Sequence, residues 1–253
     1  MANKKITELT ATTTMVAADL LPVVVDMATT PVTKKITKAN FLASVGVTNI
    51  NGWINPGETW AYASATTITV PSGAAAKYSI GDKIKLTQTT VKYFYVVAVA
   101  DTVLTVNGGS AYTVANAAIS ANFYSKVATP VGFPHWFNFT PVWTNLTVGD
   151  GTNTGSFRIA DGMVGFTLLF TLGSTSSVAS NPFVTAPVTA NNSTQLIGIN
   201  AYGDTGTENY VGYTQISNQN LYAKTSAFSG VTATAPHTWA STDTLAMAGS
   251  YKI

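Results

Sequence analysis

Hydrophobic and polar residues alternate with a period of two over much of the chain, which is the pattern of half-buried β-strands. In residues 83–86, for example, two lysines alternate with Ile84 and Leu86, so that one face is polar and the other apolar. Turn-forming Gly, Asn and Asp residues separate the alternating segments. The pattern predicts strands at residues 66–70, 83–86, 91–100, 103–106, 119–127, 155–159, 165–172, 193–199, 212–216, 220–224 and 243–251.

The first 50 residues differ from the rest because they contain few core-forming side chains. Two short strand-like segments are predicted at 20–25 and 32–36. Thr37 is a suitable N-cap for a helix over 38–45, and Gly46 is placed to end it. A helix of about two turns is marginal by itself. We therefore expect residues 1–50 to be an attachment segment that needs a partner surface.

The remainder of the chain divides into two predicted β regions. Residues 51–127 contain four or five strands and are expected to form a small β-barrel module. Residues 128–253 contain short, evenly spaced strands, which favour an antiparallel β-sandwich or jelly roll. The charge changes near Lys126: ten lysines and six acids precede that point, whereas three basic residues and five acids follow it. The predicted fold class is all-β.

The composition supports this class. Charged residues make up 9% of the chain and hydrophobic residues 46%, whereas about 25% of an average soluble domain is charged. Much of the polar character comes from 41 threonines and 18 serines. Intrinsic disorder needs low hydrophobicity and high net charge, so it is excluded. Threonine favours strands, and the residues that usually cover helix surfaces are scarce.

Charge and cysteine content exclude several classes of partner and cofactor. A net charge of +2 and a single arginine, Arg158, argue against a nucleic-acid-binding protein. The absence of cysteine excludes disulfides, thiolate chemistry and cysteine-based zinc sites. No cofactor or metal is expected. The most apolar stretch, residues 93–100, is far shorter than the ~20 residues that span a bilayer, and the N-terminus lacks a signal-peptide core.

The residues that could carry catalysis do not form a recognisable pattern. His135 and His237 are the only histidines, and no Gly-x-Ser-x-Gly nucleophile motif is present. A pair of carboxylates could act as a glycosidase, but Asp150 and Asp161 both precede glycine and are typical turn formers. The other acidic candidates in this half are Asp204, Glu208 and Asp243. We predict that the chain is not an enzyme.

A binding site is a better prediction for residues 202–222. Tyrosine rings can stack on sugar faces while amide and carboxylate groups bind the hydroxyls. The candidate ligand-binding residues are Tyr202, Asp204, Glu208, Asn209, Tyr210, Tyr213 and Tyr222. Cross-strand aromatic packing explains the same tyrosines more simply, and both interpretations stay open at this point.

Several stretches of the sequence resemble bacteriophage fibre and tail proteins. Residues 4–44, KKITELTATTTMVAADLLPVVVDMATTPVTKKITKANFLAS, are similar to the N-terminal attachment segment of phage fibres. Residues 59–88, TWAYASATTITVPSGAAAKYSIGDKIKLTQ, resemble a small β module that recurs in phage tail proteins. Residues 139–159, 170–190 and 231–251 resemble consecutive parts of a C-terminal β-sandwich of such fibres. Residues 195–230 match nothing in the family.

This resemblance implies a structural virion protein, assembled in the host cytoplasm, that forms a homotrimeric tail or head fibre or spike. Residues 1–50 would bind other virion proteins, and the C-terminal domain would contact host-surface polysaccharide. No membrane insertion is implied. Two alternatives stay open: a capsid decoration or adaptor protein without a receptor, and a polysaccharide depolymerase, which usually shows a long repetitive β-helix that this chain lacks.

Overall fold

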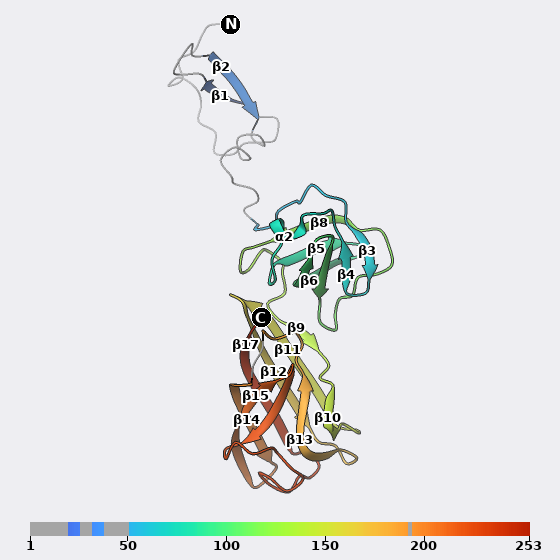
Figure 1. Cartoon of the computed structure of the whole chain (residues 1–253), viewed down its shortest axis with the longest axis vertical. Helices are drawn as coiled ribbons and strands as arrows, with labels where there is room; N and C mark the ends of the chain where they lie inside the picture. Colours follow the sequence, from blue (N-terminus) through green and yellow to red (C-terminus); the bar gives the residue numbers. More distant parts are fainter. Residues whose placement is uncertain (1–19, 26–31, 38–50, 192–193) are drawn as a thin grey trace. The chain divides into compact units, whose positions relative to one another are not determined.

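A computed structural model of the chain describes residues 20–25, 32–37, 51–191 and 194–253 (Figure 1). The chain divides into two compact units, Met1–Asn51 and Gly52–Ile253. The prediction of an all-β chain is confirmed, because antiparallel strands dominate the described residues and their one helix is the four-residue α2 (Ala74–Lys77).

The first unit contains an antiparallel pair of strands, β1 (Leu20–Val25) and β2 (Val32–Thr37). Leu20 lies opposite Thr37, and Val25 lies opposite Val32. The two strands predicted in the first 50 residues are therefore confirmed. The helix predicted at 38–45 lies outside the described residues.

The N-terminal part of the second unit is a six-stranded antiparallel sheet (Figure 1). Buried side chains alternate along its strands and cover one face, as the sequence pattern predicts, and they include Ile84, Leu86, Phe94 and Leu104. The strands follow one another in the sheet in the order β3 (Ala61–Ser64), β4 (Thr67–Thr69), β7 (Val103–Asn107), β6 (Val91–Ala100), β5 (Lys83–Thr87) and β8 (Ser120–Ser125).

The C-terminal part of the second unit is a nine-stranded antiparallel sheet. Its order is β10 (Trp143–Thr147), β13 (Ser177–Thr185), β16 (Asn220–Thr225), β15 (Glu208–Ser217), β14 (Gln195–Asp204), β17 (Thr244–Lys252), β12 (Met163–Thr171), β11 (Thr152–Ala160) and β9 (Phe137–Phe139).

This sheet curls around its own core (Figure 1). Its two edge strands, β9 and β10, are separated by only residues 140–142, so the far ends of the sheet must approach each other. Asn153 of β11 links the two edges: its amide donates to the Pro141 carbonyl at 2.7 Å and accepts the Trp143 indole N–H at 3.0 Å. Fully buried phenylalanines, including Phe157 and Phe170, fill the inside.

The two sheets of the second unit share an aromatic core. The ring centroid of Tyr95, on β6, lies 5.0 Å from that of Phe133 and 5.2 Å from that of Phe137. The Asn107 amide donates to the Pro187 carbonyl at 2.8 Å. The segments 51–127 and 128–253 therefore pack together within one unit through buried aromatic side chains.

Candidate functional site

The residues predicted to bind sugar lie in three different places in the nine-stranded sheet. Tyr202 and Tyr210 are on the inner side of the sheet, whereas Tyr213 and Tyr222 are on the outer side. The three polar candidates, Asp204, Glu208 and Asn209, lie at the tip of the β14–β15 hairpin. They do not form one constellation.

Tyr202 belongs to the core, since its side chain has no exposed surface. Its hydroxyl donates to the Lys224 carbonyl at 2.7 Å and accepts the Asn200 amide N–H at 2.9 Å. Burial, partly offset by the Asn200 hydrogen bond, raises the pKa of Tyr202 to about 12. The ring is thus unavailable for stacking on a sugar.

The other tyrosines are covered by aromatic neighbours. Tyr213 stacks on Phe228 with ring centroids 4.6 Å apart and planes inclined by 5°. Tyr222 lies 4.9 Å from Phe183 and carries the Lys224 ammonium 5.2 Å from its ring centroid. Aromatic packing between strands, the alternative to a sugar site, accounts for both pairs.

The hairpin tip encloses a shallow hollow of about 360 Å³. Asp204 lies opposite Glu208 in the strand register, with both carboxylates at the turn. Partial burial, a hydrogen bond to Glu208 and the charges of Glu208 and Asp204 raise the pKa of Tyr210. Among the described residues, no three potential metal-ligating side chains gather, here or elsewhere.

Beneath this tip lies a buried His237–Asp243 pair. The His237 ring stacks on Tyr210 at 5.3 Å and contacts Trp239 at 4.3 Å. Its Nε2 is 3.3 Å from Asp243 Oδ2, but neither ring nitrogen makes a well-aligned hydrogen bond in the described part of the chain. Asp243 accepts backbone N–H groups of Thr205 and Ala240 at 3.0 and 2.7 Å. These bonds tie the β14–β15 tip to the segment before β17.

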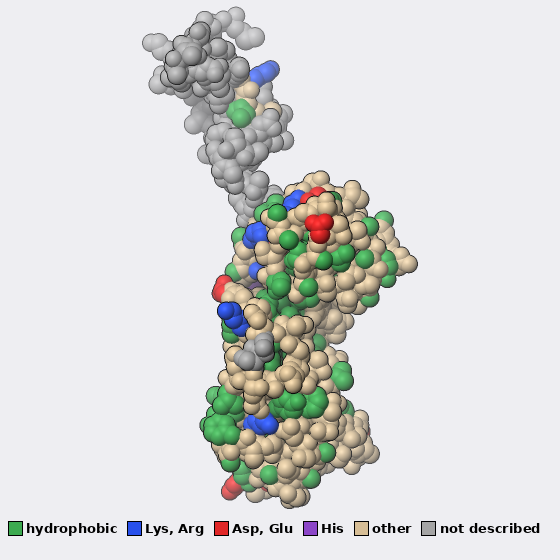
Figure 2. All heavy atoms as spheres, in the orientation of Figure 1, with side chains coloured by type: hydrophobic (Ala, Val, Ile, Leu, Met, Phe, Trp, Pro, Cys, Tyr) green, Lys and Arg blue, Asp and Glu red, His purple; other side chains and the backbone are tan. Residues whose placement is uncertain are grey.

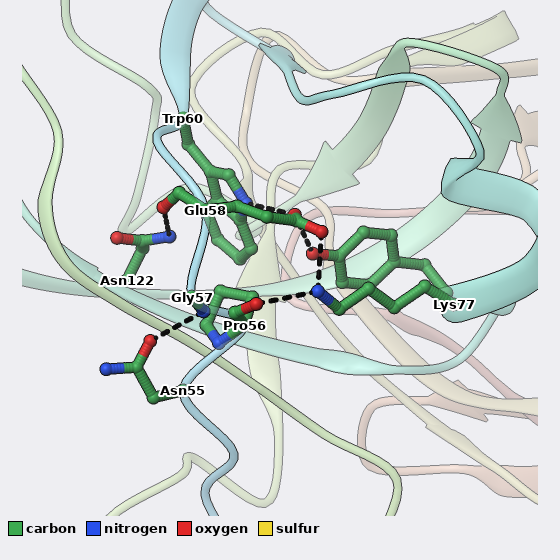
Figure 3. Close-up of polar contacts among 8 residues, drawn as sticks. Asn55, Pro56, Gly57, Glu58, Trp60, Lys77 and Asn122 are labelled. Carbon is green, nitrogen blue, oxygen red and sulfur yellow. Dashed lines mark hydrogen bonds and ion pairs between the residues drawn. The ribbon is translucent and has the colours of Figure 1, made fainter.

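A second polar cluster surrounds Glu58 at the start of the six-stranded region (Figure 3). Its carboxylate accepts hydrogen bonds from Lys77, from the Tyr78 hydroxyl at 2.6 Å and from the Trp60 indole at 3.3 Å. Burial would raise the pKa of Glu58, but these bonds and the Lys77 charge outweigh it and hold the pKa below its usual value. Asn122 donates to the Glu58 carbonyl at 3.1 Å. The cluster fastens the segment 55–60 to α2 and β8.

The most unusual surface is the outer face of the nine-stranded sheet, where seven hydrophobic residues and Thr167 lie in two adjacent cross-strand rows. One row aligns Leu169, Ala246, Ala201 and Val211, and the other aligns Thr167, Ala248, Ile199 and Tyr213. We refer to these eight residues as the apolar face. Ile199 and Val211 are 64% and 60% exposed.

None of the eight residues of the apolar face is charged, and Lys224 of β16, which lies opposite Tyr213, borders the face. Figure 2 likewise shows few charged atoms over the nine-stranded part of the chain. Contiguous apolar surface of this kind usually marks a binding interface. A signal for it exists in the sequence: β14, β15 and β17 carry apolar residues at both odd and even positions, as strands buried on two sides do.

No helix within the described residues is long and apolar enough to cross a membrane. Comparison with known protein families, with curated proteins and with solved structures finds no match for this chain.

Proposed function

We propose that the chain is a structural component of a bacteriophage virion, a homotrimeric fibre or spike on the tail or head. The apolar face carries this proposal. A sheet surface with exposed isoleucine and valine and no charge in its two rows is costly in water, because about 25 cal/mol is lost for each Å² of apolar area left exposed. Burial against copies of the same chain removes that cost.

The division of the chain supports the same proposal. Met1–Asn51 is a unit separate from Gly52–Ile253, as expected if the first segment attaches to other virion proteins while the second reaches the host surface. The resemblance of residues 4–44 to fibre attachment segments agrees with this division of roles. We place the protein in the virion, assembled in the host cytoplasm, with no catalytic role.

Immunogold electron microscopy of intact, purified phage particles tests the proposal. Antibodies raised against Gly52–Ile253 should label the particles at a fixed position, on the tail or on the head. Label confined to unassembled protein, with none on purified particles, would contradict a structural role in the virion. Particles that lack the protein should lose adsorption if it contacts the host, whereas unchanged adsorption would indicate a decoration or adaptor protein.

A further inference from the structure

A groove runs along the outer side of the sheet at its β9 edge, next to the apolar face. It encloses about 420 Å³. Six of the side chains that line it come from β9, from the residue after β9, from β11 and from β12. They are Asn138, Thr140, Thr154, Ser156, Thr167 and Leu169. Thr167 and Leu169 also end the two rows of the apolar face, so the groove lies at the border of that face.

The walls of the groove are neutral and rich in hydrogen-bonding groups. Asn138, Ser156 and Thr167 lie side by side in the strand register, and the Ser156 and Thr167 hydroxyls are 2.8 Å apart. In the described part of the chain, the side chains of Asn138 and Thr140 make no hydrogen bond. Amide and hydroxyl groups that are free to bind, beside the apolar wall of Leu169, match the mixed polar and apolar surface of a sugar.

One end of the groove continues into an aromatic residue and a cation. The Arg158 guanidinium carbon lies 5.1 Å from the centroid of the Trp136 ring, which is 40% exposed. Both side chains cover Gly165: a β-carbon there would lie 3.6 Å from Arg158 and 3.8 Å from Trp136. Arg158 makes no ion pair with any described residue, so its charge is available to a ligand.

The groove and this end are in line along β11. Arg158, Ser156 and Thr154 follow at intervals of two residues and point to the same side. At about 3.3 Å per residue, they extend over about 13 Å, which is enough for a short oligosaccharide. The guanidinium can form two parallel hydrogen bonds with a carboxylate, which a neutral sugar does not offer.

We infer that this β9–β11–β12 groove binds an acidic, carboxylate-bearing oligosaccharide, with Arg158 on the carboxylate, Trp136 on a sugar face, and Asn138 and Ser156, which lie outside the apolar face, on hydroxyls. The inference rests on the proposed function, because a spike that contacts a host surface needs a receptor. The groove contains none of the seven residues that the sequence predicts to bind sugar. A trimer would present three grooves, so weak binding at each would add up to strong attachment to a polysaccharide.

Calorimetric titration of the full chain tests the inference, with hyaluronan and oligogalacturonate fragments as acidic probes and maltohexaose as the neutral probe. The acidic probes should bind, and maltohexaose should bind at least about tenfold more weakly. Arg158→Gln should weaken acidic binding about tenfold or more, and Trp136→Ala should also weaken it. Lys224→Gln is the matched control, because it removes the same charge from the outer side of β16, and it should leave binding unchanged.

Three results would overturn the inference: no binding of either acidic probe at millimolar concentration, equal binding of maltohexaose, or equal losses in Arg158→Gln and Lys224→Gln. Light scattering on the same samples shows whether the chain is a trimer, so failure of the sugar-binding inference can be distinguished from failure of the proposed function. A trimer without sugar binding would refute only the groove, and a monomer that binds the acidic probes would refute only the trimer.

Discussion

Replacing Tyr202 by phenylalanine tests whether this residue is a core residue, as the structure has it, or a ligand contact, as its sequence neighbourhood suggests. The change removes one buried oxygen and keeps the ring. The Lys224 carbonyl loses a donor at 2.7 Å, and the Asn200 amide loses an acceptor at 2.9 Å. Asn200 retains its bond to the Tyr213 carbonyl at 2.6 Å, and Lys224 stays paired with Tyr213 in the β15–β16 ladder.

The change removes two hydrogen bonds of a buried hydroxyl, each worth about 0.5–1.5 kcal/mol, so the expected loss in the free energy of unfolding for Tyr202→Phe is about 1–3 kcal/mol. The matched control is Tyr213→Phe, whose half-buried ring is on the outer side and should keep its stacking on Phe228. It should change stability by less than about 0.5 kcal/mol. Urea denaturation at one fixed protein concentration measures both, because the stability of an oligomer depends on concentration.

The same hydroxyl makes a prediction for alkaline pH. Burial raises the pKa of Tyr202 from 10.0 to about 12, so the folded state holds the proton more tightly than the unfolded state. The raised pKa of Tyr202 contributes about 2–3 kcal/mol to the free energy of unfolding, because it differs by two pKa units from the unfolded value. This contribution is complete below pH 10 and is lost as the pH rises from 10 to 12. Tyr202→Phe should flatten this part of the stability curve. Wild-type stability in Tyr202→Phe, together with loss of sugar binding, would refute the assignment of Tyr202 to the core.

Two further substitutions probe the packing of the second unit. Glu58→Gln should lower the free energy of unfolding by about 1–3 kcal/mol at neutral pH. Because the pKa of Glu58 is below 4.5 in the folded state, the difference between wild type and variant should be complete above that pH and disappear as the pH falls below it. A difference that does not change with pH would contradict the ion pair. Gly212→Ala should cost about 3 kcal/mol or more, since a β-carbon would lie 2.0 Å from the Lys224 carbonyl oxygen and 2.8 Å from the Tyr202 ring. Gly165→Ala is the control for Gly212→Ala, because a β-carbon at residue 165 would make only ordinary van der Waals contacts. Equal thermal stability of the two alanine variants would contradict the close approach at Gly212.

Sequence patterns predict the strands where one face of a strand is clearly apolar. Strand β12 alternates buried Val164, Phe166, Leu168 and Phe170 with more exposed residues, and its position is predicted to within two residues. Strand β13 was missed, because Pro182 and Asn181, with a φ of 57°, interrupt a stretch rich in Ser and Thr. The short edge strands β9 and β10 were missed for lack of length.

The candidate site was harder to predict because it depends on which face of the sheet each residue occupies. Tyr202 and Tyr213 are close in sequence, yet they lie on opposite sides of the sheet. The period of the sequence does not show which residues face the core, because the inner and the outer side of the sheet both carry apolar residues, such as Tyr202 inside and Ile199 outside. The β9–β11–β12 groove depends on pairing between strands more distant in sequence, such as Asn138 with Ser156, which single-sequence patterns do not contain.

The mass of the purified chain, measured by light scattering after size exclusion, tests the central claim most directly. The wild-type chain and Val142→Lys, a control at a 72% exposed valine outside the apolar face, should each give a particle near three times 26.5 kDa. Ile199→Lys places a charge in the middle of the apolar face and should shift the mass toward 26.5 kDa. A stable, monodisperse wild-type monomer, or a trimer that Ile199→Lys leaves intact, would contradict the claim that this face joins three copies.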